Sequence, residues 1–92
     1  MSDDGYREAR AAAKLPRAGI AARWFDSGWC AAADREVLHY PGGDDARVRY
    51  ALHRFGPDMA NRTGRRAFAK GVRAKLAYYR RAGHLDPLQT NT

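Results

Sequence analysis

Large apolar side chains are scarce in this chain of 92 residues. Leucine, isoleucine, valine and phenylalanine together supply only 13 residues, whereas alanine alone supplies 18. A chain with so little apolar surface and so much charge often stays disordered. Ten aromatic residues, with Trp24 and Trp29 among them, offset this shortage. We therefore expect a single small domain over residues 1–92 with an aromatic-centred core, and we exclude a large core.

Both ends of the chain carry little that folding could bury. Residues 1–4 are short and polar, and residues 86–92 hold a proline and mostly polar side chains, so we expect flexible ends. No run of 18 apolar residues occurs, and the acidic start lacks the apolar stretch of a secretory signal. The single cysteine, Cys30, cannot form an internal disulfide. These features predict a cytoplasmic protein without a membrane span.

Two helices are expected in the first third of the chain. The first covers about residues 4–14, with Asp3 or Asp4 as its cap and a proline after its end. The second covers about residues 17–34 and is apolar around most of its circumference, which suits a central, buried helix. The turn signal Asp26-Ser27-Gly28 inside it leaves open a division into two shorter helices.

The segment 36–56 fits two structures. Apolar and polar residues alternate along it with the period of a strand, and its two halves flank a Pro-Gly-Gly turn. This pattern predicts a β-hairpin at about 36–52, which would make the fold α+β.

The same segment also fits a helix, which is the interpretation that we favour. Apolar residues recur at helical spacing between residues 48 and 55, Asp44 or Asp45 could cap the start, and Gly56-Pro57 is a stop signal. The predicted fold class is therefore all-α, a small single-domain bundle of about four helices that ends in a long basic helix.

That last helix is the clearest element in the sequence. It should start at Asn61 or Thr63 and end near Ala82, with Gly83 in the left-handed position that follows many helices. One face of it carries an apolar stripe made of Phe68, Val72, Leu76 and Tyr79. Tyr78 falls on the flank of this stripe, where an exposed ring could stack on a nucleic-acid base.

A second flank of the last helix is lined by small residues, namely Gly64, Ala67, Gly71 and Ala74. Glycine inside a helix costs about 1 kcal/mol relative to alanine. The two glycines are therefore either tolerated in a long helix or kept for close approach of another backbone. A backbone from a second copy of the chain would make the protein a homodimer.

The whole net charge of +7 lies in the last third of the chain. Residues 1–58 hold nine basic and nine acidic side chains, whereas residues 59–92 hold eight basic and one acidic. Arg65 and Lys75 fall on the apolar side of the last helix. The other six basic residues share an arc of about 100° away from the stripe; they are Arg62, Arg66, Lys70, Arg73, Arg80 and Arg81.

Like charges along one helix face repel each other unless a partner neutralises them. Arginine, which supplies 14 of the 17 basic residues, makes planar, bidentate contacts with phosphate. We therefore predict a regulatory protein that binds the phosphate backbone of DNA or RNA through these six residues. One alternative is a small phage-type inhibitor, for example an anti-defence protein, that docks on an acidic surface or in a nucleic-acid channel of a host complex. Another is a charged face that only keeps the chain soluble.

No residue pattern indicates catalysis, a metal or a cofactor. His39, His53 and His84 lack metal-ligand spacing to one another and to Cys30, which we expect to be a small buried residue. Ser27 lacks the surroundings of a nucleophile, and the glycines before Asp44 lack the lysine of a phosphate loop. The last two helices resemble a helix-turn-helix only loosely because their connection is too long. We expect no enzyme and no sequence-specific readout.

Overall fold

A computed structural model describes residues 3–83, with side chains from Gly5 onward. Over this range it contains five helices and no strand: α1 Asp3–Ala13, α2 Ile20–Ala31, α3 Arg35–Leu38, α4 Asp44–Phe55 and α5 Arg62–Arg81. The all-α prediction is confirmed and the β-hairpin at 36–52 is wrong. The predicted flexible end at 86–92 lies outside the described residues. Of the predicted flexible end at 1–4, only the backbone of residues 3 and 4 is described, and it is helical. The predicted aspartate cap of α1 involves side chains that are not described.

The helix α4 explains why the hairpin does not form. Helical spacing places Val48 and Ala51 together in the core, with exposed fractions of 3% and 0%, whereas a strand would point them to opposite faces. The residue that caps α4 is Gly43, and no side chain caps the first backbone N–H groups of the helix. The predicted cap by Asp44 or Asp45 is therefore wrong, and both aspartates lie in the first turn, where negative charge is stabilising.

The second helix is shorter than expected at both ends. It begins at Ile20 because Gly19 has a φ of 106°, a left-handed conformation that a helix does not continue through. After Ala31 the chain turns, and the side chain of Asp34 accepts a hydrogen bond of 2.9 Å from the backbone N–H of Glu36 to start α3. The turn signal at 26–28 does not divide α2, since the helix runs through it.

The last helix has the predicted bounds. Asn61 caps it, accepting a hydrogen bond of 2.9 Å from the backbone N–H of Gly64. Gly83 follows its end with a φ of 84°. The stripe is confirmed as well: Phe68, Val72 and Leu76 are fully buried, and Tyr79 packs against the same core while partly exposed.

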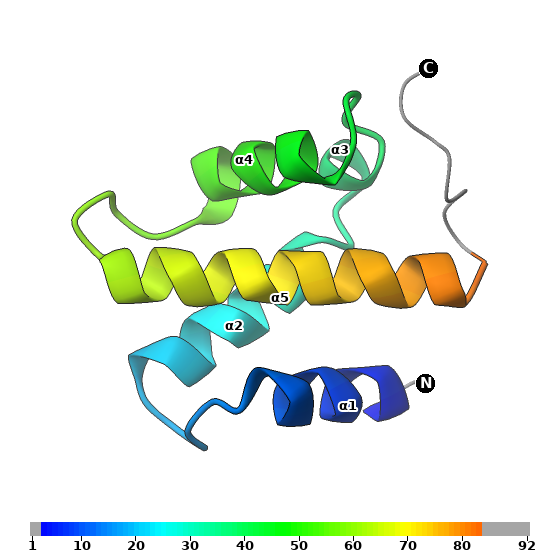
Figure 1. Cartoon of the computed structure of the whole chain (residues 1–92). Helices are drawn as coiled ribbons and strands as arrows, with labels where there is room; N and C mark the ends of the chain where they lie inside the picture. The colour runs from blue at the N-terminus through cyan, green and yellow to red at the C-terminus, as the bar shows by residue number, and fades with distance from the viewer. Residues whose placement is uncertain (1–2, 84–92) are drawn as a thin grey trace.

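The helix α5 is the centre of the arrangement (Figure 1). α1 and α4 lie on either side of it and run in the opposite direction, while α2 crosses behind it. Contacts from α4 to α5 agree with this direction: Asp44 at the start of α4 reaches Arg80 near the end of α5, and Pro57 after α4 reaches Arg65 near its start. One side of α5, opposite α2, is left facing solvent.

The crossing of α2 and α5 is a backbone-to-backbone contact. A Cβ atom at Gly28 would overlap the carbonyl oxygen of Phe68, and a Cβ atom at Gly71 would overlap the carbonyl oxygen of Phe25. Each helix thus contributes one glycine against the backbone of the other. Close packing along the small flank of α5 is confirmed, with a helix of the same chain as the partner. Gly64 and Gly71 therefore give no argument for a homodimer.

Polar contacts attach α1 to α2. The carboxylate of Asp26 accepts hydrogen bonds from the hydroxyl of Tyr6 at 2.5 Å and from the guanidinium of Arg10 at 3.0 Å. Arg10 also donates to the carbonyl of Pro16 at 3.0 Å, while the ring of Tyr6 lies edge-on against Trp29. These bonds compensate for the few apolar residues of α1, which is too short to be stable alone.

Replacing Gly71 with alanine should lower the free energy of unfolding by about 2 kcal/mol or more, because the added methyl group forces the two backbones apart. The change occurs although alanine favours a helix by about 1 kcal/mol over glycine. Denaturant unfolding of the purified variant measures the effect. Gly64→Ala is the matched control: its Cβ would meet side-chain atoms of Asn61 and Trp24 at 2.7 and 2.8 Å, and side chains can shift. A Gly71→Ala variant as stable as the parent would contradict the proposed close crossing.

Candidate functional site

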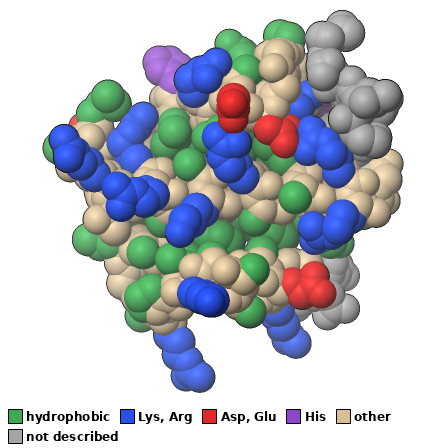
Figure 2. Space-filling view, in the orientation of Figure 1, with side chains coloured by type: hydrophobic (Ala, Val, Ile, Leu, Met, Phe, Trp, Pro, Cys, Tyr) green, Lys and Arg blue, Asp and Glu red, His purple; other side chains and the backbone are tan. Residues whose placement is uncertain are grey.

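The solvent-facing side of α5 carries a cationic strip of five side chains. All five are exposed, and over the length of the helix they span roughly 28 Å; they are Arg62, Arg66, Lys70, Arg73 and Arg81. Figure 2 shows Lys and Arg side chains spread along this face, with apolar side chains exposed below them between α5 and α1. The side chains of Arg62, Arg66, Lys70 and Arg81 form no ion pair and no hydrogen bond with other residues of the described part.

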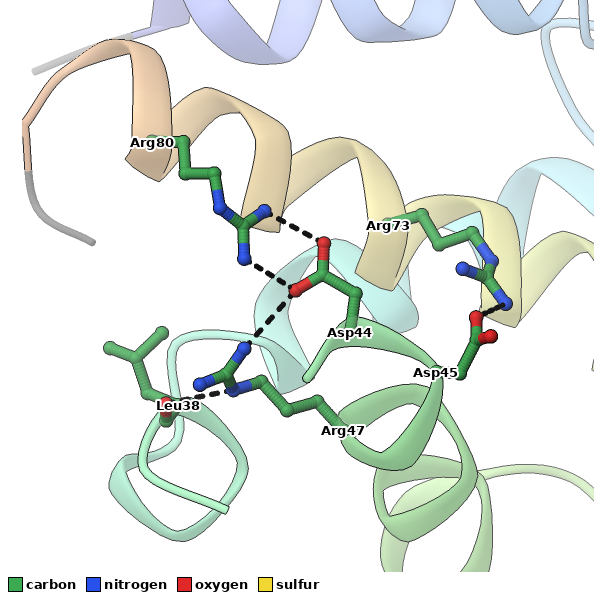
Figure 3. A network of polar contacts seen from close by, with 6 residues as sticks. All are labelled: Leu38, Asp44, Asp45, Arg47, Arg73 and Arg80. Carbon is green, nitrogen blue, oxygen red and sulfur yellow. Dashed lines mark hydrogen bonds and ion pairs between the residues drawn. The ribbon is translucent and has the colours of Figure 1, made fainter. Parts of the chain in front are cut away.

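The sixth predicted residue, Arg80, is occupied within the chain. Its guanidinium donates two hydrogen bonds of 2.7 Å to the carboxylate of Asp44 (Figure 3). The same carboxylate accepts a bond of 3.1 Å from Arg47, whose side chain is only 2% exposed and which also donates to the carbonyl of Leu38. Asp44 thus links α4 to α5 through Arg80, and to α3 through Arg47. Arg80 is therefore part of the contact that holds these helices together.

The hydrogen bonds from Arg80 hold the pKa of the Asp44 carboxyl below its ordinary value, although partial burial opposes the shift. The same bonds raise the pKa of Arg80. Both groups are therefore charged at neutral pH. A buried guanidinium such as that of Arg47 needs a nearby carboxylate to compensate for its lost hydration, and Asp44 is the only carboxylate in the described part that forms an ion pair with it.

Arg73 has a weaker intramolecular partner. Its guanidinium lies 2.8 Å from a carboxylate oxygen of Asp45, with side-chain exposures of 52% and 74% (Figure 3). Exposed pairs of this kind contribute only about 0–1 kcal/mol. Arg73 can therefore exchange Asp45 for another anion at little cost.

The two basic residues predicted on the apolar side of α5 lie there. Arg65 donates a hydrogen bond of 2.9 Å to the carbonyl of Pro57. The ammonium of Lys75 lies 4.6 Å from the centre of the Trp29 ring and 5.2 Å from that of Tyr79. Burial lowers the pKa of Lys75, and the two rings stabilise its charge.

The sequence interpretation missed the two aspartates as partners of the strip. Their position in the first turn of the helix that precedes the Arg-rich α5 was a usable signal, because an antiparallel neighbour brings the first turn of α4 beside the last turns of α5. By sequence alone, the same position predicts a helix cap. Within the described part, Arg73 is thus the strip residue with an acidic partner, Asp45, while Asp44 holds Arg80 beside the strip.

A shallow groove of about 520 Å³ lies between α1 and α5. Its floor is apolar, with Phe25 and alanines of both helices, while Lys70, Arg73 and Arg81 line one wall and Glu8 the other. Tyr78 does not offer an open ring nearby, since it contacts Trp29 and lies against Gly5 of α1.

Outside the strip, Cys30 differs from the expectation. Cys30 is exposed, so its predicted burial is wrong: the α2 residues that face the core are instead Ala22, Phe25 and Trp29. Across residues 3–83, no three His, Cys, Asp or Glu side chains gather as a metal site requires. None of the helices in that range has the length and apolar character needed to cross a bilayer.

Comparisons with known protein families, with curated proteins and with solved structures return no match for this chain. Inference about its function therefore rests on the charges and contacts of its own residues, above all on the cationic strip.

Replacing Asp44 with asparagine should lower the free energy of unfolding by about 2 kcal/mol at neutral pH, because the buried guanidinium of Arg47 and that of Arg80 lose their anion. Asp45→Asn makes the same charge change in an exposed pair and should cost less than about 0.5 kcal/mol. A group with a lowered pKa in the folded state loses its contribution as it protonates. The difference between the parent and Asp44→Asn should therefore begin to shrink as the pH falls below about 4, the ordinary pKa of an aspartate, and close at lower pH. Denaturant unfolding from pH 7 to pH 3 tests this, and equal losses for the two variants would contradict it.

Proposed function

We propose that this protein is a non-enzymatic nucleic-acid-binding protein that contacts the phosphate backbone through the cationic strip of α5. The observation that carries the proposal is a set of four exposed cations that form no ion pair and no hydrogen bond with any other residue the structure describes, namely Arg62, Arg66, Lys70 and Arg81. They lie on one side of one rigid helix, so a single polyanion can reach all four.

Arg73 and Arg80 contribute to this proposal in different ways. Arg73 joins the strip when a phosphate displaces the exposed carboxylate of Asp45. Arg80 stays with Asp44 and holds α4 against α5, so it acts on the shape of the surface rather than as a phosphate ligand. The proposed contact residues are thus five of the six predicted from the sequence.

The strip favours recognition of backbone over base sequence. Phosphate contacts position a protein on nucleic acid without reading bases. α4 and α5 lie antiparallel, side by side, whereas the helices of a helix-turn-helix cross at about 90–120°. This pair therefore lacks the geometry of a recognition helix, and we expect affinity to depend little on sequence.

The groove beside α1 favours a second candidate, an inhibitor that docks on an acidic protein surface. Its floor of alanine and Phe25 offers apolar contact, which nucleic-acid backbones do not use and protein interfaces do. Nuclease treatment of a pull-down from cell extract separates the two. The nucleic-acid proposal predicts that digestion empties the pull-down, and the inhibitor candidate predicts that one protein remains bound.

Affinity for duplex DNA should fall with salt, with a slope of log K against log[salt] of about −4.5 for five phosphate contacts. Fluorescence anisotropy between about 50 and 200 mM salt measures it. Changing Arg62, Arg66 and Lys70 together to glutamine should reduce the slope to about −2, and should weaken binding similarly on unrelated sequences.

The control removes the same charge elsewhere. Arg7, Arg23 and Arg35 are exposed, form no ion pair in the described part and line neither the strip nor the groove. Their glutamine triple variant should keep most of the slope. Equal losses in the two triple variants, or no binding at about 50 mM salt, would reject the strip as the binding surface.

A further inference from the structure

A pair of stacked tyrosine rings lies at the surface where α4 begins. The ring centres of Tyr40 and Tyr50 are 4.4 Å apart and their planes differ by only 13°. The ring pairs around the core are tilted or edge-on instead, with interplanar angles of 70° for Tyr6 and Trp29 and 60° for Trp24 and Phe68. The Tyr40–Tyr50 stack thus differs in geometry and in position.

The two rings of the stack have different roles. Tyr50 packs partly against the core, and its hydroxyl donates a hydrogen bond of 2.7 Å to Glu36, which fixes the ring. Tyr40 precedes the turn before α4, and 37% of it is exposed. Tyr50 is therefore the fixed inner ring, and Tyr40 is the outer ring with surface available for contact.

Two side chains of α4 lie between α5 and this stack. Arg49 and His53 line a hollow together with both tyrosines. The same two residues line the neighbouring hollow, which also holds Asp58 and reaches Arg65, a residue of α5 outside the strip. Arg49 also follows Asp45, the partner of Arg73, by one turn of α4. In Figure 2 a histidine and a Lys or Arg side chain lie together above the strip, toward α4.

The negative charge of the nearby Glu36 carboxylate is partly offset by its own partners. It accepts the hydrogen bond from Tyr50, and its oxygen lies 3.5 Å from the guanidinium of Arg54. The hollow in front of the rings is lined by Arg49 and His53 and by no acidic side chain of the described part.

We propose that the Tyr40–Tyr50 stack binds an unpaired base of a single-stranded nucleic acid, whose phosphates continue along Arg49 and the cationic strip. This inference rests on the proposed function and names its substrate class. An aromatic ring stacks on any base whose face is open, and contributes about 1–3 kcal/mol per base. In a duplex the neighbouring pairs cover both faces of a base, so only a single strand can use an exposed ring.

The test compares two strands of about 20 nucleotides, one of thymidines and one of abasic sites, which carry the same phosphates. The cationic strip cannot distinguish them, whereas the tyrosine stack can. The parent protein should bind the thymidine strand about tenfold more tightly than the abasic strand. Tyr40→Ala should bind both strands alike with an unchanged salt slope, and Tyr40→Phe should restore the preference.

Two controls separate stacking from folding. Phe55→Ala removes an equally exposed aromatic ring from the other end of α4 and should leave the preference unchanged. Thermal unfolding of Tyr40→Ala should show a folded protein, since losing one ring pair costs only about 1 kcal/mol.

Each remaining outcome counts against the inference. Equal affinity of the parent for both strands, or tighter binding of a duplex at the same salt, overturns the stacking subsite and leaves backbone binding by the strip standing. Failure to bind any of the three probes overturns the proposed function and the subsite together.

Discussion

The fold depends on the close crossing of α2 and α5 at Gly28 and Gly71. A protein with so few large apolar residues cannot fill a wide gap between helices. At this crossing the two helix backbones are in direct contact, so no gap has to be filled. The glycines let each backbone touch the other, which brings Phe25 and Trp29 of α2 and Phe68 of α5 into one small core. Dispersion contacts per residue are greatest when packing is this close.

The crossing also determines which side of α5 stays in water. α2 covers the small flank, and α1 and α4 take the two neighbouring sides. The remaining side holds the residues that no helix of the chain could cover without burying charge. The separation of charge on α5 thus follows from its central position in the bundle. Its apolar and small residues pack against three helices, and its cations occupy the side that faces solvent.

Helical periodicity was sufficient to predict the elements that are long and regular. The stripe from Phe68 to Leu76, the bounds of α5 and the glycine flank could all be read from spacing. The four residues of α3 are too few for any period, so that helix was missed. The burial of Cys30 was predicted wrongly because α2 is apolar on nearly every side, and only the position of Gly28 decides which side meets α5.

The spacing of residues along the sequence could not predict which side chains of different helices contact each other. The bond of Asp44 to Arg80 joins residues 36 positions apart, and it requires α4 and α5 to lie antiparallel at one particular register. The Tyr40–Tyr50 stack has the same origin, since it forms only when the turn before α4 brings Tyr40 back over the helix. Local signals at Asp44 and Asp45 indicated a helix start correctly, but their partners come from tertiary structure.

The charges of α5 consequently differ along its length. Near its C-terminal end, Asp44 and Asp45 of α4 offset part of the positive charge and would repel an approaching phosphate. Near its N-terminal end, no carboxylate of the described part forms an ion pair with Arg62, Arg66 or Lys70, and the positive end of the helix dipole adds to their field. The later turns of α4, with Arg49 and His53, lie beside this same half because the two helices are antiparallel. We therefore expect a polyanion that follows the whole strip to be held most strongly over the first half of α5, from where a single strand can also extend across α4 by way of Arg49 to the tyrosine stack.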